Sequence, residues 1–365
     1  TANPGQQILV QELIKTDTTL SSKRFSGYAV HKWFWGEKDR YSLSTGVRVT
    51  YRDLSDELLV SPRATLTYKP DWKRKWAFRL ATGVYYQPPF YREMRDYNGK
   101  LNTGLLSQRS IHLVAGSDYT FLAWGREFKF VSEAYYKKLD NLVPYKVENL
   151  RLRYFANNNS SGYATGMDFR INGEFVQGIE SWASLSILKT EENLSDDFYY
   201  DYYNSDGQQI IPGFTFNDTP TDSVRFEPGK IARPTDQRFT FSLFFQDYLP
   251  KFPTYRMSMT LVYGSGLPFG PPGKDKYKDV LRYPSYRRVD IGFSKTIVDE
   301  DNPAKSRIKL FNNLNYFSIG LEVFNLLQVN NTVSYLWVAD VTDRTYAVPN
   351  YLSARTLNLK LNARF

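Results

Sequence analysis

The stretch YGSGLPFGPPGK, Tyr263 to Lys274, has the spacing most suggestive of chemistry, because glycines beside a lysine can cradle a phosphate. A Walker loop needs a glycine six residues before its lysine, but that position is Pro268, and Asp275 replaces the required Ser or Thr. In the dinucleotide fingerprint the third glycine would fall on Phe269. The prolines of this stretch also lack the backbone N–H groups that bind phosphate. We therefore expect a turn-rich connection and no nucleotide site.

Residues suited to catalysis or metal binding are sparse. His31 and His112 are the only histidines, and neither lies near a serine or aspartate in a hydrolase motif. A G-x-S-x-G nucleophile elbow does not occur, and the absence of cysteine excludes disulfides and cysteine-based metal or redox sites. We therefore expect no enzyme activity, no metal site and no cofactor.

The charge of the chain also limits its partners. A formal net charge of +9 would suit a nucleic-acid ligand. The basic residues, however, are spread among aromatic residues along the chain and are not gathered on one helix face. We therefore expect no nucleic-acid partner.

The composition combines many aromatic residues with a polar average. Aromatic residues make up 16% of the chain, with 28 Tyr and 25 Phe, while the mean hydropathy is −0.49. This combination is typical of a membrane β-barrel, whose strands are apolar on one side and face a wet lumen on the other, with aromatic girdles at both interfaces. No apolar run reaches the roughly 18 residues of a transmembrane helix. The first residues, TANPGQQILVQ, do not resemble a signal peptide, so an exported chain would begin after its signal or inside the precursor.

The final segment 357–365, LNLKLNARF, alternates apolar and polar residues without exception. Period two over this length predicts a strand with one apolar and one polar face. The same alternation occurs in segments 41–52, 239–245, 257–263 and 289–294. Helical periods of comparable length do not appear, so we expect about 13 strands.

The predicted connections fall into two length classes that alternate along the chain. The short ones are Glu37 to Arg40, Asp71 to Lys75 and Tyr248 to Pro253. The long ones are Gln87 to Gln108, Asn141 to Gly162, Thr190 to Gln237, Gly264 to Pro284 and Val338 to Ser353. Two links break the rule, namely the short Asp53 to Glu57 among the long set and the longer Asp299 to Asn315 among the short set. Alternating short and long connections are what an up-and-down outer-membrane barrel requires.

These observations favour an all-β fold, an antiparallel up-and-down transmembrane β-barrel with about 13–14 strands in this chain. A soluble β-sandwich or propeller is the alternative, but its strands would be nearer about 5–6 residues long. Many segments here reach at least the roughly 9–11 residues of a tilted membrane strand. The chain also ends on Phe365, which resembles the terminal aromatic signature that the outer-membrane barrel-assembly machinery recognises.

Several motifs follow one another in a recognisable order. The first is GYAVHKWFWGEKDRYSLSTGVRVTYRDLSDELLVSPRATLTYKP, in which G-Y-x-x-x-x-W, GVR and SPR segments succeed each other. The later ones are YYQPPFYREMRDYNG, SEAYYKKLDNLVPY, GYATGMDFRINGEF, YGSGLPFGPPG, YRRVDIGFSK, LEVFNLLQVNNTVSY and LNARF. Together they resemble the barrel region of TonB-dependent outer-membrane receptors, especially of the Bacteroidetes type, over nearly the whole chain.

The resemblance implies a barrel larger than this chain. Such receptors have about 22 strands around a plug domain, and a short TonB box precedes the plug. Residues 1–365 are therefore expected to be the C-terminal portion of the transmembrane β-barrel domain, with the N-terminal plug and the first strands absent. A partial barrel leaves two strand edges whose polar groups cannot face lipid. We expect the plug and the remaining strands to come from the same precursor or from another chain.

The resemblance also implies a location and a function. The chain would be integral to the bacterial cell outer membrane, in contact with its lipids. It would bind a scarce ligand at extracellular loops and import it with energy from the inner-membrane TonB complex, and a surface lipoprotein is a further candidate partner. The alternatives are a passive pore, a structural or secretion-complex barrel and, as a minor one, a barrel-type protease or lipase. The cargo stays open among iron chelates, cobalamin, glycans and peptides.

Placing Phe365 at the periplasmic rim puts Thr190 to Gln237 and Gly264 to Pro284 outside the cell. Tyrosines give broad, stiff contact surfaces with a polar tip, and clustered carboxylates suit a cationic ligand. The candidate ligand-binding residues are Asp196, Asp197, Tyr199, Tyr200, Asp201, Tyr202, Tyr203 and Phe269. The plainer alternatives are a solvated acidic loop in the first segment and simple loop architecture around Phe269.

Polar residues of the predicted strands would face the lumen and dock the plug. These residues are Arg48, Arg52, Glu133, Arg238, Asp290 and Glu322. Charge is tolerated there because the lumen is wet or filled with protein, whereas an arginine at the lipid midplane would destabilise the barrel by about 2–4 kcal/mol.

Overall fold

The computed structural model describes residues 19–148, 150–176, 179–211, 213–249, 252–271, 280–299, 314–340 and 344–365. Secondary structure in these ranges is β throughout, apart from one short 3-10 turn, η1 (Glu37–Asp39). No helix in the described ranges has the length and apolarity needed to cross a membrane. The first residues, most of the link from Asp299 to Asn315, and Pro272, Lys274 and Asp275 of the glycine-rich stretch lie outside the described residues.

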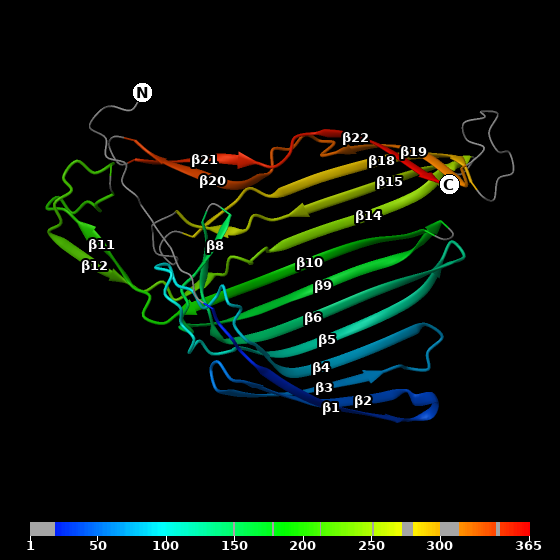
Figure 1. Cartoon of the computed structure of the whole chain (residues 1–365), viewed down its shortest axis with the longest axis horizontal. Helices are drawn as coiled ribbons and strands as arrows, with labels where there is room; N and C mark the ends of the chain where they lie inside the picture. Colours follow the sequence, from blue (N-terminus) through cyan, green and yellow to red (C-terminus); the bar gives the residue numbers. More distant parts are fainter. Residues whose placement is uncertain are drawn as a thin grey trace.

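One antiparallel sheet of 14 strands forms the body of the chain (Figure 1). Its strands follow sequence order, as an up-and-down barrel requires. They are β1 (Arg24–Trp35), β2 (Tyr41–Arg52), β3 (Glu57–Tyr68), β4 (Lys75–Gln87), β5 (Gln108–Ala123), β6 (Arg126–Leu142), β9 (Ser160–Val176), β10 (Ile179–Leu194), β14 (Phe239–Leu249), β15 (Phe252–Gly264), β18 (Tyr286–Val298), β19 (Tyr316–Phe324) and β22 (Thr356–Arg364), with the short β13 (Lys230–Ala232) beside β10. The predicted fold class and strand number are confirmed.

The two ends of the sheet differ in their connections. Most strands are joined by tight turns at one end and by long connections at the other (Figure 1), and the two predicted exceptions remain, namely the long link between β18 and β19 and the short link between β2 and β3. The long connections are not simple loops, because four of them form hairpins of their own. These hairpins are β7 (Tyr145–Glu148) with β8 (Arg151–Tyr154), β11 (Tyr199–Tyr203) with β12 (Asp222–Phe226), β16 (Pro268–Phe269) with β17 (Leu281–Arg282), and β20 (Thr332–Ala339) with β21 (Thr345–Tyr351).

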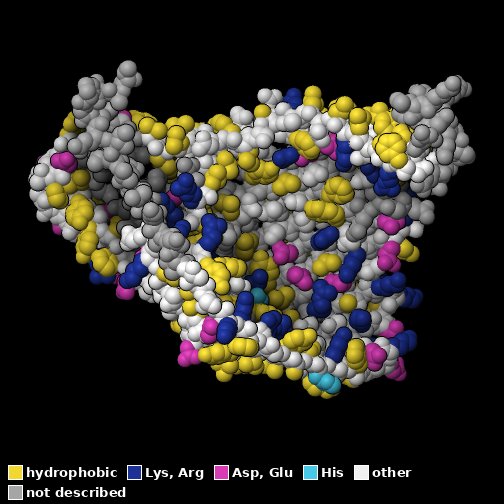
Figure 2. Space-filling model, in the orientation of Figure 1, with side chains coloured by type: hydrophobic (Ala, Val, Ile, Leu, Met, Phe, Trp, Pro, Cys, Tyr) yellow, Lys and Arg dark blue, Asp and Glu magenta, His cyan; other side chains and the backbone are white. Residues whose placement is uncertain are grey.

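The pairing register gives the sheet one apolar and one polar face. Leu321 lies opposite Leu359 on one side and Phe293 on the other, so apolar residues form a row across three strands. The next residue, Glu322, lies opposite Asn358, and the Asn358 amide donates a hydrogen bond to it at 2.8 Å. The polar face lines a hollow in which Lys, Arg, Asp and Glu side chains gather (Figure 2). The alternation read from the sequence therefore holds in three dimensions.

Aromatic rings form a belt on the apolar face near the tight turns. Neighbouring rings across β1 to β6 have centroids 4.5–6.4 Å apart. The belt contains Trp35, Tyr41, Tyr68, Phe78, Trp76, Tyr119, Phe121 and Phe128. Such a belt marks the level of a membrane–water interface.

Few large apolar side chains are fully buried, because a single-layered sheet has no second layer to cover it. The small core that exists lies among the long connections, where Met94, Leu105 and Val143 are almost completely buried. Leu54 and Tyr154 pack against it. This core holds the β4–β5 connection against the base of the β7–β8 hairpin.

Candidate ligand-binding cleft

The β7–β8 hairpin separates its charged from its apolar side chains by strand alternation. Lys146 lies opposite Arg153, and Glu148 lies opposite Arg151, so these four side chains share one face. The Glu148 carboxylate joins them through the Arg153 Nε atom at 3.0 Å and the Lys146 Nζ atom at 3.8 Å. The opposite face carries Tyr154, which packs on the small core. The core therefore fixes the direction in which the charged face points.

Four aromatic residues from two connections form a second cluster nearby. The Phe269 ring stacks on Tyr283 with centroids 4.2 Å apart and lies 5.1 Å from Tyr335. Tyr283 and Tyr335 are nearly parallel, with 5.5 Å between their centroids, and Trp337 lies 6.3 Å from Phe269. Burial, and secondarily the neighbouring Tyr335, raises the pKa of the Tyr283 phenol. The cluster thus brings together the β16–β17 and β20–β21 hairpins.

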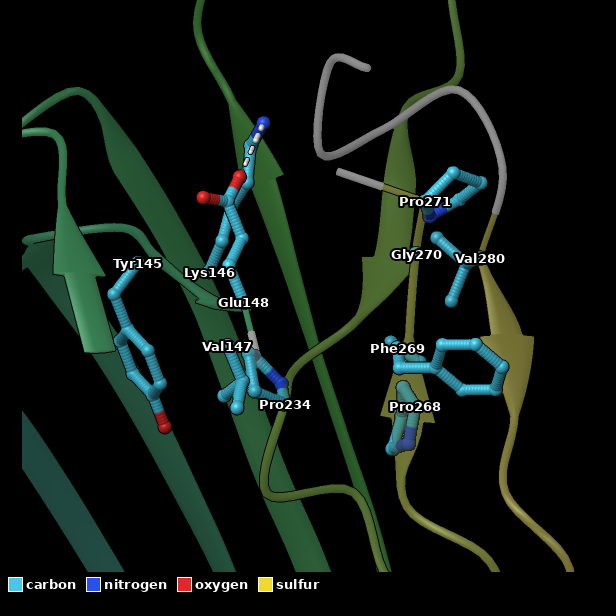
Figure 3. Close-up of a pocket in the computed structure, with 11 residues that line it drawn as sticks. Tyr145, Lys146, Val147, Glu148, Pro234, Pro268, Phe269, Gly270, Pro271 and Val280 are labelled. Carbon is cyan, nitrogen blue, oxygen red and sulfur yellow. Dashed lines mark ion pairs between the residues drawn. The ribbon is translucent and has the colours of Figure 1, made fainter. Parts of the chain in front are cut away.

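A cleft runs between the charged hairpin and the aromatic cluster. Glu148, Arg151 and Arg153 form one side of it, and the opposite side contains Phe269 and Tyr335. A smaller adjoining pocket extends past Val147 towards Pro234 and Pro268. Figure 3 shows this pocket, with the ion pair between Lys146 and Glu148 on the β7 side and Phe269 on the facing segment.

A second pocket lies beside the same hairpin and is rich in arginine. It is lined by Arg92, Arg95, Asp96, Tyr97, Arg151, Leu152, Arg153 and Tyr154. Arg92, Arg95 and Arg151 are exposed, and none of them is ion-paired within the described part of the chain. Asp96 is engaged by backbone N–H groups of its own turn, at Asn98 and Lys100. The pocket is therefore strongly positive.

Tyr97 gives this pocket an unusual polar group. Its hydroxyl is buried and has no hydrogen-bond partner among the described residues. Burial, and then the charge of Glu148, raises the pKa of this phenol, so it remains a neutral hydrogen-bond donor at physiological pH. Lys146 and Arg153 lie 5.8 and 5.9 Å from the centre of its ring. An unpaired buried donor beside several arginines is suited to an acceptor group of a ligand.

The chemistry of the two pockets is complementary. Guanidinium groups bind carboxylate, sulfonate or phosphate groups in a planar, two-pronged geometry and also stack on rings. Aromatic side chains offer faces to flat apolar groups. Arg151 and Arg153 line both pockets, so one ligand can reach both. Among the described residues, no group of His, Asp and Glu side chains is arranged to hold a metal ion.

The candidate tyrosines are divided between the two faces of one short strand, and their role in ligand binding stays a prediction. Tyr199 to Tyr203 form strand β11, paired with β12, so the side chains alternate between its two faces. Tyr200 and Tyr202 are exposed on one face, while Tyr199 and Tyr203 are half-buried on the other with Asp201. Asp196 and Asp197 lie in the preceding turn, and burial raises the pKa of the Asp197 carboxyl. None of these residues lines the cleft as the structure describes it, whereas Phe269 does.

The residues predicted to face the lumen are arranged in several ways. Arg48, Asp290 and Glu322 lie on the polar face by register, as does Glu133, whose carboxylate lies 3.3 Å from Arg79. Arg52 is almost completely buried beside Glu57, 3.8 Å away. Arg238 precedes β14, pairs with Asp236 at 2.7 Å and with Glu191 at 3.7 Å, and lies beside Ile187 and Lys189 on the apolar face, so the structure contradicts its predicted lumen-facing position. Phe365 is exposed just beyond β22. Their roles in plug docking and barrel assembly stay predictions.

Most charged and aromatic residues of the two pockets are not predicted from the sequence, namely Arg92, Arg95, Tyr97, Glu148, Arg151, Arg153, Tyr283, Tyr335 and Trp337. A signal existed, because R-x-R and Y-x-W place two side chains on the same face of a strand. The R-x-R segment falls inside the predicted long connection from Asn141 to Gly162, so the β7–β8 hairpin is not predicted.

Comparisons with known proteins agree with this architecture. The model of the TonB dependent receptor-like β-barrel family matches residues 2–326. The outer membrane transporter YddB from Escherichia coli is 14% identical, with a TM-score of 0.60 over 95% of this chain and 46% of that one. The ferric-catecholate import receptor Fiu from E. coli K12 is 12% identical, with a TM-score of 0.58, and the match covers 94% of this chain and 45% of that receptor. The FrpB iron transporter from Neisseria meningitidis is 12% identical, with a TM-score of 0.55, and the match covers 93% of this chain and 45% of that transporter.

At these identities the similar structures support the fold alone, and the chain spans slightly less than half of their length. No curated protein sequence is similar enough to count as a match. The family match covers most of the chain and describes receptors, not enzymes. The chain therefore belongs to the TonB-dependent receptor β-barrel family and is an integral outer-membrane protein.

Proposed function

We propose that this protein is an active importer that takes up its ligand with energy supplied by the inner-membrane TonB complex. The long connections then lie outside the cell, and the cleft beside the β7–β8 hairpin lies on the ligand's path from the medium. The family match and the transporters among the similar structures support this reading. The Bacteroidetes origin and a partner lipoprotein stay predictions.

The observation that carries the proposal is the pairing of the arginine-rich pocket with the aromatic cleft. Arg92, Arg95 and Arg151 lack ion-pair partners among the described residues, and Tyr97 offers a buried hydroxyl. An anionic ligand that also carries flat apolar groups would satisfy both pockets. Two of the similar structures are receptors for a ferric catecholate and for ferric enterobactin. A ferric catecholate, which is anionic and aromatic, is therefore the first probe we propose.

We also propose that residues 1–365 form the C-terminal part of a larger barrel that encloses a plug. In the described chain β1 and β22 each pair on one side only, and exposed strand edges cannot remain unpaired in lipid. The polar face would then contact the plug. Arg79 is a suitable contact, because it already links Asp118 at 2.9 Å to Glu133 at 3.3 Å across neighbouring strands.

Uptake of an iron-55 catecholate complex by intact cells tests the proposal. We expect accumulation in cells that carry the protein and its loss when the TonB system is deleted. The double variant Arg92→Gln with Arg151→Gln should reduce binding by about tenfold or more, because each charge-assisted hydrogen bond contributes about 1.5–3 kcal/mol.

Lys100→Gln is the matched control, because Lys100 lies in the same connection as Arg92 but does not line the arginine-rich pocket. Its uptake should equal that of the unmodified protein. Uptake that persists without TonB would instead identify a passive pore. Uptake that depends on TonB but not on the arginines would show that the ligand binds elsewhere.

A further inference from the structure

The apolar face of the sheet carries a furrow that is separate from the ligand cleft. It crosses β4, β5, β6, β9 and β10. Its floor is low because Ala115 and Ala134 lie directly opposite one another on neighbouring strands. Its walls are side chains that are each about half exposed, namely Leu80, Leu113, Tyr136, Met167 and Ile187.

Polar groups in and beside this floor are already satisfied. The Ser117 and Ser132 hydroxyls lie side by side below the alanine pair and hydrogen-bond to each other at 2.8 Å. The Thr165 hydroxyl donates to the Tyr135 carbonyl oxygen at 3.0 Å. These polar groups of the furrow therefore do not need water as a hydrogen-bond partner, and such a surface suits a hydrocarbon chain.

Basic side chains surround the furrow where it reaches the long-connection end. Lys138 lies directly opposite Tyr163, and the Nζ atoms of Lys189 and Lys230 lie 5.8 and 5.3 Å from the Tyr163 ring centre. Lys189 itself lines the furrow, as does Arg238. A tyrosine flanked by lysines at the edge of an apolar band is expected at the level of lipid headgroups.

The charges of this rim do not cancel. Lys189 pairs with Glu191 at 3.0 Å, while Arg109 and Lys138 share Asp140 at 2.8 and 3.7 Å. Lys230 adds a further positive charge above the Tyr163 ring. Arg238 lies 3.7 Å from the same Glu191 and 2.7 Å from Asp236, which also pairs with Arg282. The cations of this rim therefore outnumber its carboxylates. The side chains of Lys138 and Lys189 remain 58% and 44% exposed, so both can reach a ligand in the membrane.

We propose that this furrow and its basic rim form a binding site for a phosphorylated, multiply acylated lipid of the extracellular leaflet. One acyl chain lies in the furrow over Ala115 and Ala134, and a headgroup phosphate lies among Lys138, Lys189 and Lys230. The site depends on the proposed orientation, with the long connections outside, but it does not depend on the identity of the imported ligand.

Native mass spectrometry of the natural protein, purified from outer membranes in detergent, tests this site. The probe is a bis-phosphorylated, hexa-acylated glucosamine disaccharide, compared with the same lipid without phosphates. We expect the phosphorylated form to be retained and the dephosphorylated form to be lost. Joint replacement of Lys138, Lys189 and Lys230 by Gln should reduce retention about tenfold.

Two matched controls separate a specific site from general charge or hydrophobicity. Lys295→Gln removes a lysine that also sits over a tyrosine, 4.9 Å from the Tyr255 ring centre, but near the tight turns, and retention should not change. Ala134→Leu fills the furrow and should reduce retention several-fold, whereas Ala183→Leu, on the same face but outside the furrow, should not.

Equal retention of the two lipid forms, or unchanged retention in the triple variant, would overturn the proposed site. Unchanged retention in Ala134→Leu would overturn the placement of the acyl chain. None of these variants changes a residue of the ligand cleft, so TonB-dependent uptake should stay normal in them. Loss of the bound lipid together with normal uptake would confirm the lipid site, and it would leave the proposed transport function untouched.

Discussion

At the scale of single residues, arginine and tyrosine side chains around the β7–β8 hairpin determine what the cleft can bind. The charge or ring of each side chain is known from its residue type. Their proximity in the fold cannot be read from the sequence, because Arg92, Arg151 and Tyr335 come from three separate connections. Phe269, a predicted candidate, lines the cleft, whereas most of its neighbours there are not predicted from the sequence, and its role in binding stays a prediction. A long connection specifies local turns, whereas contacts between connections depend on how the whole barrel end assembles.

Tyr97 provides a test at this scale. Removing its buried, unpartnered hydroxyl should leave stability unchanged or slightly higher, because no hydrogen bond is lost. Because the hydroxyl is proposed to donate a hydrogen bond to the ligand, Tyr97→Phe should nevertheless weaken ligand binding several-fold. Thermal unfolding and titration with an aromatic sulfonate, whose charge is constant from pH 6 to 9, measure the two effects.

The pH dependence gives an independent check on the same residue. Burial raises the pKa of Tyr97, and guanidinium groups keep their charge, so affinity for the sulfonate should be constant over that range. A lower melting temperature for Tyr97→Phe with unchanged affinity would show that the hydroxyl is only structural. A loss of wild-type affinity between pH 8 and 9 would contradict the neutral phenol.

At the scale of elements, the strands could be predicted because period-two alternation is a local property. Segment 357–365 contains enough information to assign β22 and its two faces. The hairpins β7–β8 and β11–β12 were interpreted as loops, because their strands are only four or five residues long. Short strands carry too few repeats for a period to be recognised.

Gly173 tests how closely the strands pack. A Cβ atom there would lie 2.4 Å from the ring of Phe128, which stands directly opposite on β6 and is 2% exposed. Gly173→Ala should therefore destabilise the barrel by about 1–3 kcal/mol, because the ring would have to move.

Gly27→Ala is the matched control, since a Cβ atom at that strand glycine has nothing within 4 Å. Urea unfolding in micelles, followed by tryptophan fluorescence, measures both variants. Equal midpoints for the two variants would argue against the ring-on-glycine packing.

At the scale of the whole molecule, the alternation of short and long connections predicts both the barrel and its orientation. We expect a single cysteine at Tyr200, in β11, to react with a membrane-impermeant maleimide on intact cells. A cysteine at Lys38, in the η1 turn, should react only after the outer membrane is permeabilised. The reverse labelling pattern would invert the orientation and move the proposed lipid site to the periplasmic leaflet.

The open edges at β1 and β22 allow another test at this scale. Expressed alone and refolded in micelles, residues 1–365 should not give the compact, heat-modifiable monomer of a closed barrel on a gel, because both edges lack partners. Co-refolding with the remaining strands should restore that band. A stable compact monomer from this chain alone would show that it closes by itself.

In the membrane, the apolar face of each strand contacts lipid while the polar face lines the interior. The chain has no cysteine, so single cysteines introduced along β10 from Ala183 to Ile187 can carry a nitroxide spin label without background. In outer-membrane lipid, oxygen accessibility should be high at positions 183, 185 and 187 and low at Ser184 and Ser186. High values at the two serines, or low values at all five positions, would show that the apolar face does not contact lipid.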